Sequence, residues 1–255
     1  MRITFSVLLI ASLFFCLEGC SALKNGKDNS GESRKFRSKT KLNLSHSHLD
    51  EIPAYVFELT QLTVLNLHHN NITEIPADIN KLVNLEKLII SRNDLVELPE
   101  ELGDLKNLEV LSLKANKLTH IPESFGNLEK LEVCRLSFNN LTYLPISIGK
   151  LKALSHFYID YNQIEFLPNE IGQMTGLREF IVGRNNLTVL PPEFYELTSL
   201  NVLDLSYSGP LLQLAYGICK MRSIETLYID LNTLNFAPRC IEVRANGVRF
   251  TLVIK

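Results

Sequence analysis

A period of 23 residues runs through most of this 255-residue sequence and restricts its fold more than any other feature. Rows of 23 written from Lys39 give nine rows, of which the eighth carries one extra residue near Gly209 and Pro210. Leu, Ile or Val fills position 6 of every row, Asn fills position 9 of seven rows, and eight of the ten prolines fall at position 15. Because such short units cannot bury their apolar faces alone, the pattern predicts a solenoid of stacked turns.

Each recurring position has a physical interpretation. Apolar residues at positions 4 and 6 suit a short strand with one buried face, and one strand per turn predicts a parallel concave sheet. The amide of the position-9 Asn can bond backbone groups of adjoining turns, which Ser47 and Ser208 should do less well in their two rows. Proline at position 15 favours an extended convex segment, followed by short helical or 3₁₀ turns. The position-19 glycines indicate a tight corner in four rows: Gly103, Gly126, Gly149 and Gly172.

The consensus L-x-x-L-x-L-x-x-N-x-L-x-x-L/I-P-x-x-I-x-x-L-x-x resembles the leucine-rich repeat family in its 23-residue, proline-containing form. Residues 39–246 carry this resemblance as nine repeats. Similar repeats occur in secreted proteins and lipoproteins of bacteria such as spirochaetes. The resemblance implies an α/β solenoid, a right-handed horseshoe with a parallel concave sheet and short 3₁₀ or extended convex segments.

The first 19 residues are typical of an export signal. Arg2 supplies a positive charge, and the next fifteen residues are almost entirely apolar. Spanning a bilayer takes about 20 apolar residues, so the segment favours a signal peptide over a transmembrane helix. The segment ends in Leu17-Glu18-Gly19-Cys20, which resembles a bacterial lipobox and predicts lipidation of Cys20. Glu18 departs from the lipobox pattern, and ordinary signal cleavage after Ala22 is the alternative. We therefore expect an exported protein, anchored to the bacterial membrane or outer surface, or otherwise secreted or periplasmic.

Two further segments flank the repeats. Residues 20–38 are polar and rich in Ser, Gly and Lys, which predicts a flexible tether. Residues 247–255 contain a weakly alternating, β-branched run, which predicts a C-terminal cap strand over the exposed end of the ninth repeat.

The cysteines of the repeats have different expected roles. Cys134 stands at the apolar position 4 and is expected to be an inert core residue. Cys219 and Cys240 lie on the convex side of neighbouring rows, where export permits a disulfide. Two free thiols are the alternative, which we favour at this point because the sequence does not supply the Cα separation that a bridge requires.

No catalytic, cofactor-binding or metal-binding motif stands out. The sequence lacks Gly-x-Ser-x-Gly, His-Glu-x-x-His, Cys-x-x-Cys and glycine-rich phosphate motifs, so we expect no enzyme and no cofactor. Four of the six histidines cluster in the first two rows: His46, His48, His68 and His69. His46 and His69 share position 8 of adjacent rows and could supply two metal ligands, but a site would need further ligands and second-shell support. We therefore interpret them as part of a solvated polar face and predict no metal site.

The concave positions 3, 5, 7 and 8 vary between rows, which is where a repeat scaffold carries specificity. The net charge of −2 is too balanced for an electrostatic nucleic-acid binder, so local contacts should dominate. Tyr and Arg are enriched at binding hot spots, whereas stacking along the sheet is the alternative role for the aromatic residues. The predicted partner-binding residues are Arg135, Phe138, Tyr158, Tyr161, Arg184, Asp204, Tyr207 and Tyr228. A second, more basic contact zone comprises His68, His69, Arg92 and Lys114.

These features predict a non-enzymatic protein-binding module on the bacterial cell envelope. The resemblance implies a protein ligand, with a host or matrix protein as one class of partner. The alternative is a structural or scaffolding envelope protein in the periplasm or outer membrane. Contact with a membrane is expected only through the N-terminal lipid, and the oligomeric state stays open.

Overall fold

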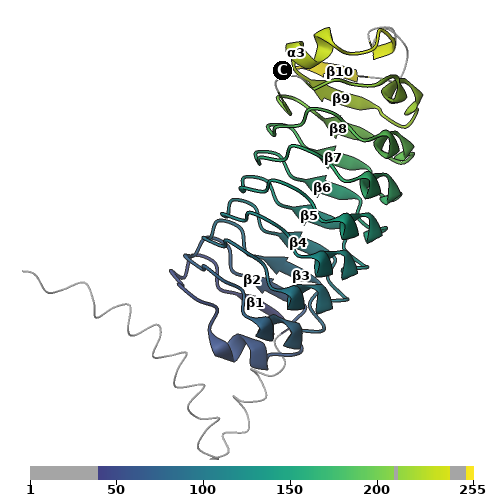
Figure 1. Ribbon diagram of the computed structural model, residues 1–255. Coiled ribbons are helices and arrows are strands. Elements are labelled where there is room, and N and C mark those ends of the chain that lie inside the picture. Colours follow the sequence, from purple (N-terminus) through teal and green to yellow (C-terminus); the bar gives the residue numbers. More distant parts are fainter. Residues whose placement is uncertain (1–39, 210–211, 242–250) are drawn as a thin grey trace, which may run out of the picture.

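The computed structural model describes residues 40–209, 212–241 and 251–255, which form one stack of turns. Figure 1 shows the strands along one side of the stack and the short helices along the other. We number turns and positions as in the sequence rows, so turn 1 starts at Lys39. The described residues contain ten strands in one sheet, ordered as in the chain. Their bounds are β1 Lys41–Asn43, β2 Val64–Asn66, β3 Lys87–Ile89, β4 Val110–Ser112, β5 Val133–Arg135, β6 His156–Tyr158, β7 Glu179–Ile181, β8 Val202–Asp204, β9 Thr226–Ile229 and β10 Thr251–Ile254.

The strands pair in parallel, and equivalent positions of successive turns lie opposite each other. Leu65 pairs with Leu42 on one side and with Leu88 on the other, and position 4 is buried in this way throughout. Because side chains alternate across a strand, positions 3 and 5 lie on the opposite, concave face. The predicted solenoid with a parallel concave sheet is thus confirmed.

Short 3₁₀ helices follow the position-15 residue on the convex side. Pro53 has φ of −59°, and its carbonyl accepts a 2.9 Å hydrogen bond from the Val56 N–H. Proline fits here because the backbone is extended and its missing N–H leaves no bond unmade. The 3₁₀ helices are η1 Ala54–Glu58, η2 Ala77–Lys81, η3 Glu100–Asp104, η4 Glu123–Asn127, η5 Ile146–Lys150, η6 Asn169–Gln173, η7 Pro192–Glu196 and η8 Tyr216–Lys220.

The position-9 asparagines join neighbouring turns through their side chains, as predicted. The side-chain oxygen of Asn116 accepts from the Leu95 N–H at 3.1 Å, and its nitrogen donates to the carbonyls of Ile90 and Leu113 at 2.9 Å each. Ser208 only donates to the Val182 carbonyl at 3.4 Å. A buried asparagine therefore satisfies backbone groups of two turns, and serine does so incompletely.

The position-19 glycines have a different role from the predicted tight corner. A Cβ on Gly126 would lie 2.4 Å from the carbonyl oxygen of Ser147, at position 17 of the next turn. Glycine is needed because two 3₁₀ helices approach closely. The roles are exchanged between turns 7 and 8, where Gly217 at position 17 leaves room for the ring of Tyr195 at position 19.

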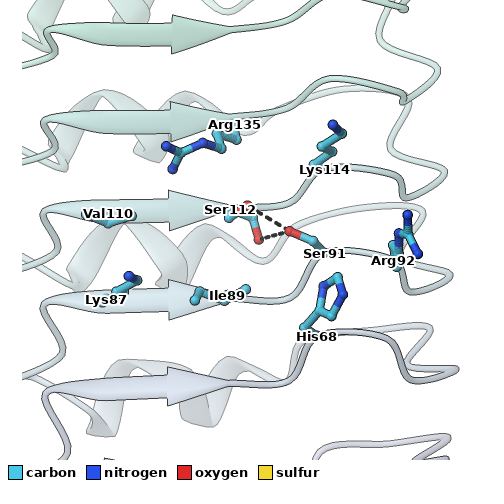
Figure 2. A pocket seen from close by; sticks show the side chains of 9 residues that line it. All are labelled: His68, Lys87, Ile89, Ser91, Arg92, Val110, Ser112, Lys114 and Arg135. Atoms are coloured by element: carbon cyan, nitrogen blue, oxygen red, sulfur yellow. Dashed lines mark hydrogen bonds between the residues drawn. The ribbon is translucent and has the colours of Figure 1, made fainter. Parts of the chain in front are cut away.

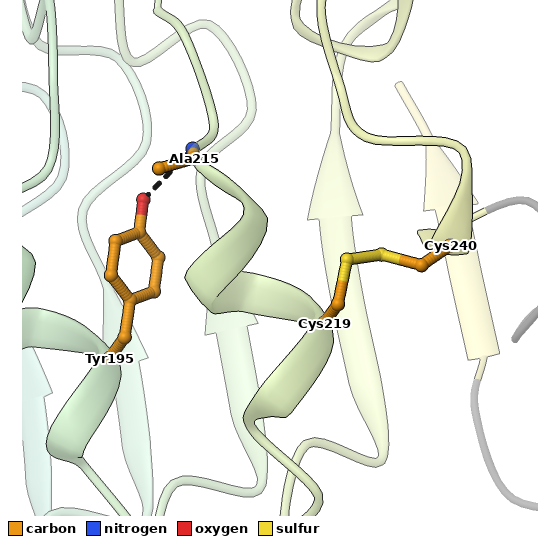
Figure 3. The surroundings of a disulfide bond; sticks show 4 residues. All are labelled: Tyr195, Ala215, Cys219 and Cys240. Atoms are coloured by element: carbon orange, nitrogen blue, oxygen red, sulfur yellow. Dashed lines mark hydrogen bonds between the residues drawn. A yellow bond between two sulfur atoms is a disulfide. The ribbon is translucent and has the colours of Figure 1, made fainter.

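A disulfide occupies the same contact between turns 8 and 9. Cys219 at position 19 and Cys240 at position 17 are bonded, with their Cα atoms 5.9 Å apart (Figure 3). The favoured expectation of free thiols is therefore corrected, because adjacent turns bring these two positions within bridging distance. Cys134 is a free, buried thiol whose pKa burial raises well above its usual range, as expected of an inert core residue.

The ninth turn departs from the repeat. The helix α3 (Leu231–Asn235) replaces the usual strand exit, so Asn232 is exposed on a helix and not in the asparagine ladder. Asp230 takes over the connection, accepting from the N–H groups of Thr233 at 3.0 Å and Tyr207 at 2.7 Å. Burial alone would raise the pKa of Asp230, but these hydrogen bonds outweigh it and lower the pKa below its ordinary value.

Strand β10 pairs with β9 and extends the sheet at the position predicted for a cap strand. The expected signal at residues 1–19, Cys20, the tether at 20–38 and the first residues of the predicted cap, 247–250, lie outside the described residues. No helix within the described part of the chain has the length and apolar character needed to cross a bilayer.

Candidate binding surface on the concave face

Position 8 of the first eight turns holds residues in the left-handed backbone region. Their φ values lie between 55° and 59°, and they are His46, His69, Arg92, Ala115, Phe138, Tyr161, Arg184 and Tyr207. This region is unfavourable for residues other than glycine. The stack holds them there, since the N–H of Phe138 bonds to the Asp160 carbonyl at 2.9 Å and that of Tyr161 to the Gly183 carbonyl at 3.1 Å. Their side chains therefore form a regular line along the carboxyl edge of the sheet.

Sequence reasoning missed this conformation, although a signal existed. No β-branched residue occupies position 8 of the first eight turns, and β-branched residues are the ones that tolerate positive φ least.

Four side chains on this line make one continuous contact, which we call the aromatic row: Phe138, Tyr161, Arg184 and Tyr207. The rings of Phe138 and Tyr161 are stacked, with centroids 4.0 Å apart. The Arg184 guanidinium lies 4.9 Å from the Tyr161 ring and 4.7 Å from the Tyr207 ring. The three aromatic residues remain 41%, 41% and 46% exposed, so the row is stacked and still accessible to a partner.

Arg135 and Tyr158 lie beside the aromatic row, on strands β5 and β6. The Arg135 guanidinium lies 5.3 Å from the Tyr158 ring, and the Tyr158 hydroxyl donates to Glu179 at 3.0 Å. Burial and the Glu179 carboxylate raise the pKa of Tyr158, against the opposing effect of Arg135. These side chains are held by the protein's own contacts and provide a rigid polar floor next to the row.

Asp204 does not belong to the exposed surface that the sequence predicts, and Tyr228 is half-buried beside Lys255. Asp204 is buried and accepts from Lys255 Nζ at 2.6 Å and from the Ser206 N–H at 2.8 Å. Lys255 Nζ also lies 4.5 Å from the Tyr228 ring. The Lys255 side chain therefore contacts both residues at this end of the concave face, and the predicted set of eight residues separates into two parts.

A basic hollow lies next to the aromatic row on turns 2–5 (Figure 2), with a volume of about 530 Å³. Among the residues that the structure describes, its lining includes no carboxylate. In the part of the chain that the structure describes, its lining residues are His68, Lys87, Ile89, Ser91, Arg92, Val110, Ser112, Lys114 and Arg135. Ser91 and Ser112 share a 2.7 Å hydrogen bond on its floor. The hollow contains three of the four residues of the second contact zone predicted from the sequence, His68, Arg92 and Lys114, but not His69. It also includes Arg135 and Lys87.

Lys114 connects the hollow to the aromatic row. Its Nζ lies 5.0 Å from the Phe138 ring while its side chain also lines the hollow. The concave face of turns 3–8 is therefore one surface with a cationic part and an aromatic part.

Three histidines converge next to this surface, at the strand exits of turns 1 and 2. One ring nitrogen from each of His46, His68 and His69 lies within 4.8 Å of the others. The sequence grouped these three histidines with His48, but it did not distinguish the three whose rings converge. Burial, followed by the neighbouring His46, Arg92 and His69, lowers the pKa of His68, against a backbone hydrogen bond with Ser91.

Comparisons with known proteins agree with this architecture. A family model described as leucine-rich repeat region matches residues 14–117, 79–181 and 111–229. A leucine-rich repeat protein of Leptospira interrogans is 26% identical with a TM-score of 0.72, covering 89% of this chain and 63% of its own length. This chain thus spans less than two thirds of that relative.

Two further solved structures are similar. The ectodomain of the Arabidopsis thaliana receptor kinase GASSHO1/SCHENGEN3, in complex with CASPARIAN STRIP INTEGRITY FACTOR 2, is 28% identical with a TM-score of 0.67, covering 80% of this chain and 25% of that one. An internalin C2 of Listeria monocytogenes is 17% identical with a TM-score of 0.64, covering 74% of this chain and 80% of that one, a likeness of fold. No curated protein matches the chain at a comparable level. The repeat, the ten-stranded parallel sheet and the family match together show that this chain belongs to the leucine-rich repeat family.

Proposed function

We propose that the protein is a non-enzymatic protein-binding module whose partner docks on the concave face of turns 3–8. The observation that carries this proposal is the continuity of the aromatic row with the basic hollow through Lys114. Exposed aromatic and Arg side chains next to a concave site are the residue types that dominate binding energy at protein interfaces.

The two parts of the surface favour a partner with two matching features. Lys87, Arg92, Lys114 and Arg135 line the hollow without a carboxylate among the lining residues, which suits an acidic segment. The aromatic row suits an apolar or planar group placed against Tyr161 and Tyr207. Since the whole chain carries a net charge of only −2, the attraction is local to the hollow.

The Arabidopsis receptor ectodomain supports a protein partner, because it was solved in complex with CASPARIAN STRIP INTEGRITY FACTOR 2. The chain spans a quarter of that receptor, so the support concerns the use of the repeat as a binding surface and not the identity of the ligand.

We propose in addition that the module is exported and held at the bacterial envelope through Cys20. The apolar segment after Arg2 and the LEGC sequence support this, with secretion or a periplasmic location as the alternative. A host or matrix protein is one class of partner, and a scaffolding role among envelope proteins is the competing function. Protease treatment of intact cells separates them, because a surface protein is digested and a periplasmic one stays protected.

The binding surface is tested by affinity capture with the purified protein, against envelope extract and against host extracellular proteins in parallel. A captured partner should bind the Arg135→Ala/Tyr161→Ala variant at least about tenfold more weakly, because both side chains lie on the proposed surface. The matched control is Phe166→Ala, which removes a 59% exposed aromatic ring from outside positions 3, 5, 7 and 8. An unchanged affinity of the double variant, with its folding intact by circular dichroism, would place the binding site elsewhere.

A further inference from the structure

We propose that His46, His68 and His69 form a binding site for a zinc-type transition-metal ion, a function beyond the proposed protein binding. Neutral imidazole is a preferred ligand of zinc, copper and nickel ions, and three histidines with an open fourth position make a known zinc arrangement.

The distances between the rings fit an empty site of this kind. The three candidate nitrogens lie within 4.8 Å of one another, and ring centroids are 4.5 Å apart for His46 and His69 and 5.6 Å for His46 and His68. Tetrahedral zinc with Zn–N distances of about 2.0–2.1 Å places its nitrogens about 3.3 Å apart. Rotation of the side chains closes the remaining gap of at most about 1.5 Å without backbone movement, because His46 and His69 are exposed.

The backbone holds the three residues in place before any ion arrives. His46 and His69 have φ values of 56° and 57°, and this conformation is fixed by hydrogen bonds between turns. The His46 N–H donates to the His68 carbonyl at 3.0 Å, and the His69 N–H donates to the Ser91 carbonyl at 2.9 Å. The Cα positions of the ligands are therefore set by the stack, which reduces the ordering needed on binding.

The charges around the site decide its strength and its fourth ligand. Arg92 is a cationic neighbour of His68 and opposes a bound cation. We expect micromolar affinity and a water or an anion as the fourth ligand, on the exposed side of His46 and His69.

Isothermal titration of the purified protein with zinc chloride, prepared without a histidine tag, tests the site. One ion per chain should bind, and His46→Ala and His68→Ala should each weaken binding at least about tenfold. Alanine is compatible with the backbone at position 8, since Ala115 has φ of 57° there. The control is His48→Ala, which removes a nearby histidine with φ of 53° that does not belong to the cluster, and its affinity should be unchanged.

Cobalt(II) provides a second readout that does not depend on heat. A site made of these imidazoles should give the visible absorption bands of four-coordinate cobalt, and the His46→Ala/His68→Ala/His69→Ala variant should lack them. Absence of zinc binding at 100-micromolar protein, wild-type binding by the triple variant, or an equal loss in His48→Ala would each overturn the proposal.

Discussion

Turns 3–7 and turns 8–9 meet the same structural demands with different side chains. In turns 3–7, an asparagine amide bonds the backbone of two turns, and glycine lets the 3₁₀ helices approach, as at Asn116 and Gly126. In turns 8–9, the carboxylate of Asp230 makes the polar connection and the Cys219–Cys240 disulfide joins the convex side. The comparison teaches that the repeat specifies contacts between turns, and that several residue types can make each contact.

The largest difference between the two regions should appear at position 9. Asn116→Ala removes the partner of the Leu95 N–H and of two buried carbonyls, so it should lower the free energy of unfolding by about 3 kcal/mol. Asn232→Ala changes the equivalent position of turn 9, which is exposed on α3, and should change it by less than about 0.5 kcal/mol. Urea unfolding of both variants checks this, and equal losses would mean that Asn232 joins the ladder in solution.

The next effect concerns the convex side of turns 8–9. The disulfide closes a loop with a sequence separation of 21 residues, so Cys219→Ala/Cys240→Ala should lower the free energy of unfolding by about 2–3 kcal/mol. The loss should be concentrated at the C-terminal end, because each turn contacts only its neighbours. Hydrogen exchange by mass spectrometry should show faster exchange in turns 8–9 and unchanged exchange in turns 3–5. Uniformly faster exchange would contradict the local role of the bridge.

Much of this comparison could be predicted from the sequence, and the failures have a common physical cause. Positions 4, 6, 9 and 15 are each defined by one residue type, so their burial or bonding follows from the repeat. Asp204 was misplaced because its partner Lys255 is 51 residues away and lies outside the repeat. The Cys219–Cys240 bridge and the Gly126 contact both join position 19 of one turn to position 17 of the next. A comparison of equivalent positions between turns does not reveal contacts between different positions.

The candidate surfaces show the same limit. All four members of the aromatic row were predicted, because they share position 8. The hollow was predicted through His68, Arg92 and Lys114, whereas the contribution of Lys87 at position 3 was not. The positive φ of position 8 produces no pattern of apolar residues in the sequence. The absence of β-branched residues at this position is its only sequence signal.

Asp230 and Asn116 should also differ in how their stabilising contributions respond to acid, and this effect is smaller than the two above. The folded pKa of Asp230 is lowered, so its stabilising contribution is present above the unfolded pKa near 3.8 and is lost as pH falls through the folded value. The amide of Asn116 does not titrate and should not contribute to acid sensitivity. Asp230→Asn should therefore flatten the dependence of the urea midpoint on pH below about pH 4, whereas a slope equal to the wild type would show that Asp230 is not the responsible group.

A second substitution at Asp230 measures how much its side chain stabilises the fold at neutral pH. Asp230→Ala removes the buried side chain that accepts from the N–H groups of Thr233 and Tyr207, and should lower the free energy of unfolding by about 2 kcal/mol. Urea unfolding at pH 7 checks this loss, and an unchanged midpoint would mean that α3 does not depend on Asp230.

The smallest effect is that of glycine at position 8, which should raise the free energy of unfolding in turn 4 and lower it in turn 9. Ala115 and Leu231 both stand at position 8, but Ala115 has φ of 57° whereas Leu231 begins α3. Ala115→Gly relieves an unfavourable left-handed residue while increasing the freedom of the unfolded chain, so a net gain of about 0.5 kcal/mol is expected. Leu231→Gly should instead lose about 0.5–1 kcal/mol, since glycine is a poor helix former. Paired urea titrations resolve the signs, and a loss at both positions would show that turn 4 does not hold Ala115 in the left-handed region in solution.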